Sequence, residues 1–566
     1  MDDAAALNLG PSLHWLDWAV IIAYLGSCVL MGIWFGRFTK TTKDFFLGGQ
    51  RFSWWVGGVS CVATLVGSYS FINYSEVGYN FGLSSMTNYT NDWFVLPLFL
   101  LAWVPIIYYS RLSSVPEYFE RRFDRRTRIA ALCITLVYLQ GYIGINLYTM
   151  GVAMRGLLGW DVTLSAALIS VLAGLVIYAG GATSIMMADL YQAFLLLAAG
   201  LMIFALGIFE LGGLDALWAG LSPAQKLPFA AFITPPEYHF VGEFWGDAIT
   251  GTIAFYFMNQ SVLLRFLSVK SVRDARKMMI FTVLVLMPIA AVSVGSAGWI
   301  GRAMASAGLI ETVPAEQAKD VFMLVARRLC APGLFGFVAA ALLAALMSTL
   351  EALIGAVSTV AVNDIWRPFV APDREDAHYL RMARILAVAA NLLGILSIPL
   401  FSRFSSIYQA LSHFTAIVTP PMVTVIVLGA VWKRFTPAAA FWTLILGSGA
   451  TLLSIFIPEL VTPLAHGEPA STGHSYMRSL YGLVVSGAFA VGISLFTRPK
   501  ADSELEGLVL GTVAAARRRF KGAEPCEKGL GVLAELRLEA NGVPASLVRL
   551  PKSAMERLEA RPATAW

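Results

Sequence analysis

Apolar runs long enough to cross a lipid bilayer recur along this chain from residue 15 to residue 498. A helix crosses the bilayer core with about 20 apolar residues, and it pairs all its backbone polar groups within one segment. The runs therefore predict an all-α polytopic membrane protein. The composition agrees, because 57% of the 566 residues are hydrophobic and only 14% are charged, against about 25% charged residues in a soluble domain.

Thirteen apolar spans are predicted from the ends of these runs. They are expected at residues 15–37, 53–80, 86–109, 127–156, 162–180, 186–210, 244–267, 277–302, 319–363, 381–401, 404–432, 437–458 and 476–498. The ninth is too long for one crossing, and an external helix at its start is one interpretation. Residues 1–498 form the predicted transmembrane domain. The polar residues 499–566 form a predicted cytoplasmic tail, whose basic cluster Arg517–Lys521 suits a membrane surface.

Lysine and arginine are unevenly distributed among the loops. The basic loops follow the first, third, seventh and ninth spans, whereas the long loop at 211–243 holds Lys226 alone. The positive-inside rule therefore places the N-terminus outside the cell and the C-terminus in the cytoplasm. The first apolar segment follows an acidic N-terminus without a cleavage pattern, so it is expected to be a retained span. The predicted location is the cell (inner) membrane.

Several other classes of protein are disfavoured. The pI of about 8.8 follows from the basic loops, so it gives no reason to expect a nucleic-acid partner. The five cysteines are scattered and lack CxxC spacing, so neither a disulfide framework nor a metal site is expected from them. A Walker-type GxxxxGK[ST] sequence is absent and no nucleophile–base constellation stands out. We therefore predict no enzyme and no cofactor; the oligomeric state is left open.

The second span is rich in glycine, serine and threonine midway across, between Trp54 and Ser70. A broken helix here would release the carbonyls near Ala63 and Val66 to face a cavity. Close packing of small residues against another helix is the alternative. A second polar interruption, Asn259–Ser261, lies in the seventh span. The two interruptions are five spans apart, as expected if two five-helix halves repeat with inverted topology.

A polar patch interrupts the ninth span. Ala345, Ser348 and Thr349 are spaced i, i+3, i+4 and share one face of a helix. Their small side chain and two hydroxyls suit a dehydrated cation with oxygen ligands, although such hydroxyls also commonly bond the carbonyl one turn back. Glu351 adds an ionisable group at membrane depth, which is costly and therefore a candidate for function.

Short motifs in a consistent order resemble the sodium/solute symporter family. They are Asp44–Gly49, Pro116–Phe123, Gly180-Gly181 with Asp189 and Gln192, Asn259-Gln260 with Arg265, Ser348-Thr349 running to Asn363–Ile365, and Pro420-Pro421 to Gly429–Arg434. The last block is most similar to the branch with the sodium/sugar and sialic-acid symporters. The resemblance covers residues 15–498. It implies a LeuT-type core, a 5+5 inverted repeat, within about 13 transmembrane helices.

The same resemblance implies a secondary active transporter, in which inward sodium flow drives uptake of a small polar organic solute by alternating access. The sodium ligands carried over from the family are the carbonyls of Ala63, Val66 and Ala345 and the hydroxyls of Ser348 and Thr349. Some members bind a second sodium with an aspartate, here Asp189, and with hydroxyls that this chain replaces by Glu351 and Ala352. We therefore expect Asp189 and Glu351 to form a second site for a cation or a proton; a purely structural pairing of Glu351 is the alternative.

The predicted solute site departs from that of hexose-transporting relatives. The corresponding positions include Tyr69, Ser70, Asp92, Asn259 and Ser412, of which only Asn259 is kept and Asp92 is a shortened equivalent. Several hydrogen-bonding groups that a hexose needs are lost, and Asp92 is compatible with a cationic or zwitterionic solute. A solute sensor that signals through the tail is the alternative function, and a channel is disfavoured because no repeated filter motif is visible.

Overall fold

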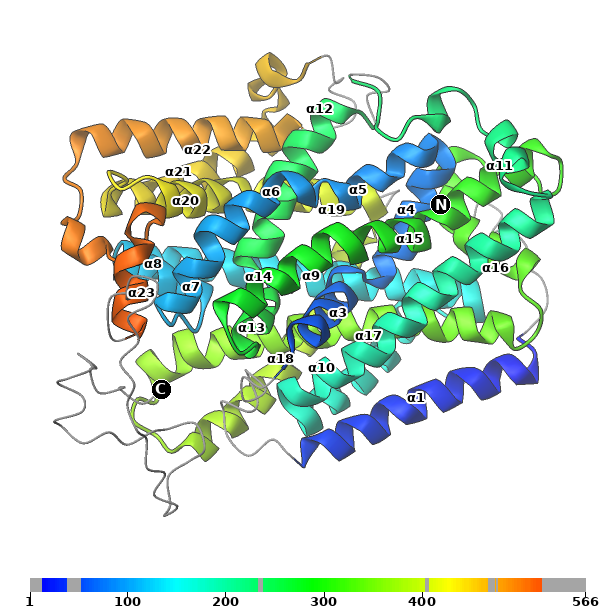
Figure 1. The fold of residues 1–566 in the computed structure, drawn as a ribbon, viewed down its shortest axis with the longest axis horizontal. Coiled ribbons are helices and arrows are strands. Elements are labelled where there is room, and N and C mark those ends of the chain that lie inside the picture. Colours follow the sequence, from blue (N-terminus) through cyan, green and yellow to red (C-terminus); the bar gives the residue numbers. More distant parts are fainter. Residues whose placement is uncertain are drawn as a thin grey trace, which may run out of the picture.

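The computed structural model describes residues 13–37, 52–232, 238–402, 407–466, 474 and 477–521. The described part is built from helices, and no strand occurs in it beyond an isolated bridge between Phe52 and Val269. Most of the long helices run in a common direction (Figure 1). A bundle of this kind satisfies the backbone within each helix, as a membrane requires.

The helices begin and end as follows. They are α1 (Trp15–Gly36), α3 (Trp54–Leu65), α4 (Ser68–Phe81), α5 (Thr87–Thr90), α6 (Asp92–Leu98), α7 (Val104–Tyr109), α8 (Val115–Arg122), α9 (Arg125–Leu158), α10 (Val162–Leu211), α11 (Leu214–Gly220), α12 (Phe240–Glu243), α13 (Gln260–Ser268), α14 (Val272–Phe281), α15 (Met287–Ser306), α16 (Val321–Leu329), α17 (Leu334–Val360), α18 (Asp376–Phe401), α19 (Ile407–Val418), α20 (Pro420–Val431), α21 (Pro437–Phe456), α22 (Met477–Phe496) and α23 (Val513–Lys521). Segments of π-helix at Phe99–Trp103, Phe244–Gly251, Ala254–Met258, Thr282–Leu286 and Ala361–Val370 extend or interrupt several of them.

The membrane class is confirmed by the length and composition of the helices. In the part of the chain that the structure describes, nine helices are long and apolar enough to cross a membrane, and three shorter apolar helices accompany them. The predicted count of thirteen crossings is not fixed by these numbers and stays a prediction. The predicted external helix before the ninth span corresponds to α16, which is separated from α17 by residues 330–333.

Both predicted interruptions are present as breaks. The second span divides into α3 and α4 at Val66 and Gly67, and the seventh divides at Asn259, where the backbone is extended before α13 begins. The span predicted at 404–432 divides as well, into α19 and α20 at Thr419. Two interrupted spans five apart fit the predicted inverted repeat.

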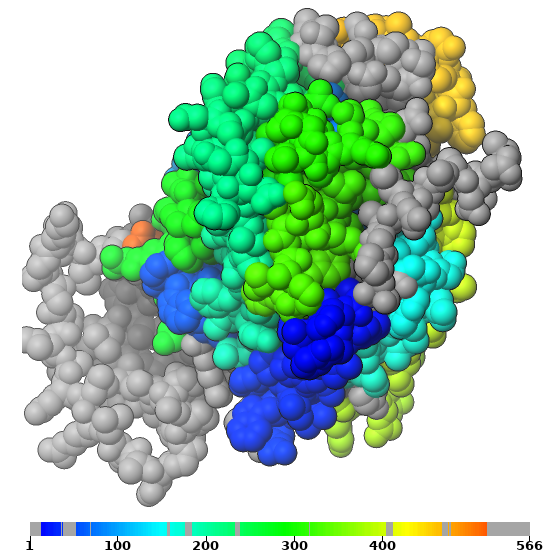
Figure 2. Space-filling view, turned by 90° about the vertical axis from the view of Figure 1, so that its right-hand side faces the viewer, coloured from blue at the N-terminus to red at the C-terminus, as the bar shows by residue number. Residues whose placement is uncertain are grey.

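Helix α17 forms the centre of the bundle. In its most apolar window 94% of the residues are buried, and it packs against α10, α9, α1 and α3. By contrast α1 lies on one flank, where Figure 2 shows it in dark blue at the surface beside its neighbours. The polar residues of α17 therefore lie inside the protein and not against lipid.

Three of the four basic loops, those after the third, seventh and ninth spans, lie at the end of the bundle that carries α7, α8 and α23 (Figure 1, left). We call it the α8 end. Tyr108 donates to the carbonyl of Lys270 at 3.0 Å, and Arg128 pairs with Asp364, so the loops after the third, seventh and ninth spans meet there. The first part of the predicted tail also packs there, because Tyr118 and Ser110 donate to the carbonyls of Leu508 and Gly507. The domain division at residue 498 stays a prediction.

Candidate functional site at the broken helices

The break in the second span is pressed against two neighbouring helices. Val66 has φ −100° and ψ 87°, and Gly67 has φ −87° and ψ −178°, so neither continues the helix. A Cβ atom on Gly67 would lie 2.9 Å from Thr349 Oγ1 and 3.1 Å from Asn146 Oδ1. The absence of a side chain at Gly67 therefore lets the break approach α17 and α9 closely.

The predicted hydroxyl pair on α17 faces this break. Ser348 Oγ donates to the carbonyl oxygen of Ala63 at 3.0 Å, and Thr349 Oγ1 donates to that of Thr64 at 3.3 Å. Both hydroxyls thus contact α3 and not the carbonyl one turn back on α17. Ala345 lies one turn before Ser348, and it is buried, as are Ala63 and Val66. The five predicted sodium ligands therefore come from two helices that the structure brings into direct contact.

Ser348 is also joined to an ion pair. Its Oγ also lies 2.6 Å from Asp189 Oδ1, so its single proton is shared between this carboxylate and the Ala63 carbonyl. Asp189 Oδ2 accepts from Ser60 Oγ at 2.5 Å and from Arg265 Nη2 at 2.6 Å. Arg265 Nε donates in turn to Ser60 Oγ, and Arg265 Nη1 to the carbonyl of Ser261. The network links α3, α10, α13 and α17, and the guanidinium balances the charge of Asp189.

Glu351 has a different environment. It is fully buried, and neither carboxyl oxygen has a hydrogen-bond partner among the described residues. It lies near Asp189 and near Tyr24 and Cys28 of α1. No hydrogen bond or ion pair is recorded between Glu351 and Asp189 in the described residues, so the structure places the two carboxyls near each other without joining them.

A cavity of about 80 Å³ opens beside the break, next to Leu65. Residues from α4, α5, α6, α9, α19, α22 and the π-helical part of the seventh span line it, among them Tyr74, Asn88, Asp92, Tyr142, Asp247 and Tyr256. Asp92 accepts from Tyr256 Oη at 2.7 Å and from Thr252 Oγ1 at 3.4 Å, and Asp247 accepts from Asn91 Nδ2 at 3.1 Å. The cavity therefore holds two carboxyl groups with neutral partners.

Among the predicted solute residues whose side chains the structure describes, one lines this cavity. Asp92 does so, whereas Ser70 lies buried in the first turn of α4 and Asn259 caps α13, its Oδ1 accepting from the backbone N–H and hydroxyl of Ser261. The side chains of Tyr69 and Ser412 lie outside the described residues. Asp247 was missed by sequence reasoning. An ionisable residue inside an apolar span was its signal, the same one that drew attention to Glu351.

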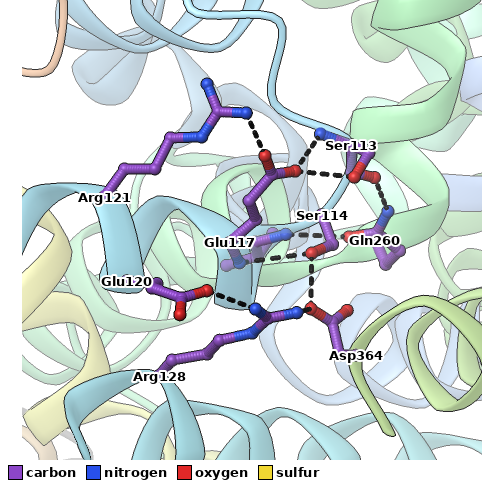
Figure 3. Close-up of polar contacts among 9 residues, drawn as sticks. Ser113, Ser114, Glu117, Glu120, Arg121, Arg128, Gln260 and Asp364 are labelled. Carbon is purple, nitrogen blue, oxygen red and sulfur yellow. Dashed lines mark hydrogen bonds and ion pairs between the residues drawn. The ribbon is translucent and has the colours of Figure 1, made fainter. Parts of the chain in front are cut away.

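A cluster of polar contacts lies at the α8 end of the bundle (Figure 3). Gln260, in the first turn of α13, donates to the carbonyl of Ser113 and accepts from the backbone N–H of Val115. Ser114 Oγ donates to Asp364 Oδ1 at 2.9 Å, and Arg128 pairs with the same carboxylate at 2.7 Å. Figure 3 also shows Glu117 with Ser113 and Arg121, and Arg128 with Glu120.

This cluster ties together three parts of the molecule that an opening at this end would separate. It joins the second half of the broken seventh span to the loop before α8, and α8 and α9 to the end of the α17 span. The cavity lies beyond it, toward the opposite end of the broken helices. These contacts hold α8, α9, α13 and the end of the α17 span together at the α8 end.

Comparisons with known proteins agree with this architecture. The family model described as the sodium:solute symporter family matches residues 45–447. The sodium/glucose cotransporter of Vibrio parahaemolyticus is 26% identical, over 80% of this chain and 87% of the relative. The sodium/sialic acid symporter SiaT of Proteus mirabilis (strain HI4320) is 24% identical over 79% and 90%, and the sodium/mannose cotransporter SLC5A10 of Bos taurus is 27% identical over 89% and 90%.

Solved structures share the fold. A sodium-coupled sialic acid symporter in a substrate-bound, outward-open state matches with a TM-score of 0.73 and 21% identity, covering 87% of this chain and 99% of that one. Mhp1, a nucleobase-cation-symport-1 family transporter in a closed conformation, matches with a TM-score of 0.52 and 12% identity, covering 81% and 96%. These similarities confirm the predicted LeuT-type architecture.

Proposed function

Since this chain belongs to the sodium:solute symporter family and performs sodium-coupled symport of a small polar solute, we propose that its coupling ion binds between α3 and α17. The ligands are the carbonyl oxygens of Ala63, Val66 and Ala345 and the hydroxyl oxygens of Ser348 and Thr349. The observation that supports this is the direct contact of Ser348 and Thr349 with the carbonyls of Ala63 and Thr64 at the break.

The donor chemistry suits sodium. All five atoms are neutral oxygens, which hard cations prefer. Ser348 Oγ and the Ala63 carbonyl oxygen lie 3.0 Å apart, so one cation at about 2.3–2.6 Å from each can contact both. Such an ion replaces the hydrogen bonds that now join α17 to α3. Asp189 contacts the Ser348 hydroxyl, but it is paired with Arg265 and is not one of the proposed ligands.

Ion binding at this place couples the two halves of the fold. The cation holds the broken second span against α17 and so fixes the wall of the adjacent cavity, in which the solute binds. Release at the other side then requires the polar cluster around Gln260 and Asp364 to open. We place the α8 end in the cytoplasm, because the basic loops gather there. A tenfold sodium gradient with 100 mV supplies roughly 3.7 kcal/mol per ion for inward transport.

Glu351 is proposed to act as a second coupling group together with the field of Asp189. An ionised carboxylate without a partner at this depth is costly, so it must take up a proton or a cation. Asp189 is already paired with Arg265. Glu351 has no such partner among the described residues, so we propose that a proton or a cation balances its charge and is exchanged during the transport cycle.

The test is gradient-driven uptake in proteoliposomes with a panel of small sugars, amino acids, carboxylates and amines, with and without a sodium gradient. Ser348→Ala is expected to abolish sodium-driven accumulation, whereas Ser358→Ala is the matched control, because Ser358 Oγ on the same helix donates to the carbonyl of Ala383 on α18. Uptake that is independent of sodium and unaffected by Ser348→Ala would contradict the proposal. Binding of a solute without any accumulation would favour the alternative, a sensor.

A further inference from the structure

The cavity beside the break holds two carboxyl groups that have no basic partner among the described residues. Asp92 is 6% exposed, and its recorded partners are the neutral hydroxyls of Tyr256 and Thr252. Asp247 is partly buried and accepts from the neutral amide of Asn91. Neither carboxylate forms an ion pair with any residue that the structure describes. A carboxylate that is taken out of water needs a counter-charge or must bind a proton, and no described residue supplies a counter-charge here.

Basic side chains are also missing from the lining. Among the described residues around the cavity there is no lysine, arginine or histidine. Arg478, whose neighbour Ser479 does line it, has contacts elsewhere: its Nε donates to Ser454 Oγ on α21 at 3.1 Å, and its Nη1 lies 3.3 Å from His413 Nδ1. A carboxylate or other anionic group in this cavity would face two carboxyl groups and no positive side chain among the described lining residues.

The remaining walls favour a cation. Aromatic rings of Tyr74, Tyr89, Tyr142, Phe255 and Tyr256 line the cavity. The rings of Tyr74 and Tyr89 meet edge to face at 4.9 Å, and those of Tyr142 and Phe255 at 5.8 Å. Aromatic walls attract ammonium groups through their negative faces, most strongly where water is excluded.

A separate observation points to a ligand in the same place. Asn88 lines the cavity and is 94% buried, yet neither its amide nitrogen nor its amide oxygen has a hydrogen-bond partner in the described residues. Buried amides are normally paired. The Asn88 amide is therefore available to a polar group of a bound solute, such as a hydroxyl or a second amine.

We propose that the transported solute is an organic cation, whose ammonium or amidinium group lies between Asp92 and Asp247 with tyrosine rings around it and a polar end at Asn88. This inference rests on the proposed function, since it assigns the solute of the same transporter. It differs from what the relatives' names state, because glucose and mannose are neutral and sialic acid is an anion.

The experiment measures binding to the purified full-length protein in saturating sodium, by isothermal titration. The probes are choline, putrescine and agmatine as cations, 3,3-dimethylbutan-1-ol as the neutral counterpart of choline, galactose, and N-acetylneuraminic acid as an anion. At least one of the three cations is expected to bind, with at least a tenfold preference over every neutral and anionic probe. Binding of galactose or N-acetylneuraminic acid with no cation bound, or no binding of any cation, would overturn the proposal.

Two variants locate the site. Asp247→Asn and Asp92→Asn are each expected to weaken cation binding at least tenfold, whereas Asp161→Asn, which removes the same charge at the exposed start of α10, leaves it unchanged. Sodium-dependent thermal stabilisation is measured on each variant and shows whether the protein is folded and its ion site intact. If cation binding survives in both cavity variants, the assignment is wrong. If sodium does not stabilise the wild-type protein, the proposed sodium site is wrong. That result does not contradict the proposal that the solute is a cation.

Discussion

Ser348 and Asp189 are joined by a hydrogen bond of 2.6 Å, although they are 159 residues apart in the chain. The bond connects a hydroxyl that faces the broken second span to a carboxylate whose charge is balanced by Arg265. Ser348 therefore contacts both a carbonyl at the break and an acid that is paired with Arg265.

Replacing Arg265 shows how much its ion pair with Asp189 contributes to the stability of the protein. Arg265→Gln leaves Asp189 charged and buried without its partner, and removing one member of a buried pair costs about 3–5 kcal/mol. The variant is expected to lower the melting temperature of the purified protein in a thermal unfolding assay. The double variant Arg265→Gln/Asp189→Asn should recover part of this loss, since no charge is left unpaired. Equal melting temperatures for the two variants would show that the charge balance is not what Arg265 supplies.

A substitution at Gly67 tests how closely the break in the second span must approach α17. Gly67→Ala places a Cβ 2.9 Å from Thr349 Oγ1, so the hydroxyl or the break has to move. Sodium affinity, measured as sodium-dependent thermal stabilisation, is expected to fall at least tenfold. The matched control is Gly449→Ala on α21, where a Cβ would meet nothing within 4 Å. Equal sodium affinity in both variants would contradict the close approach.

The site could be predicted in part because its residues carry local signals. Ser348, Thr349 and Glu351 are polar groups in an apolar run. The glycine, serine and threonine residues in the second span predict that its helix is interrupted. The pairing of Asp189 with Arg265 could not be predicted, since it depends on how α10 packs against α13, and these residues are 76 positions apart. Asp247 is instructive: the rule that singled out Glu351 applies to it equally, but it lies near the start of its span, where charged residues usually face water.

Substitutions in the polar cluster at the α8 end are expected to shift the protein toward a conformation open at that end. Gln260→Ala removes two hydrogen bonds between α13 and the loop before α8, and Asp364→Asn weakens the contact with Arg128. Spin labels at the exposed positions Arg126 and Asp373 should report a longer mean distance in both variants. Glu210→Gln, which breaks an exposed pair with Arg328 away from the cluster, is the control. Unchanged distances in all three variants would argue against a gate at this place.

Replacing Glu351 is expected to change the coupling of ions to solute uptake without destabilising the fold. Glu351→Gln removes a buried carboxyl that has no recorded partner, so stability should be unchanged or higher. Uptake should lose either its dependence on pH or one charge per cycle, measured as the ratio of current to solute flux in proteoliposomes. If ion stoichiometry and pH dependence both match the wild type, Glu351 has no part in coupling.

The central claim, that sodium binds between the break of the second span and α17, is tested most directly by binding of radiolabelled sodium to the purified protein, without reference to any solute. The wild type and Ser358→Ala should bind sodium with equal affinity, and Ser348→Ala should bind it at least tenfold more weakly. Equal sodium affinity in all three proteins would contradict the account.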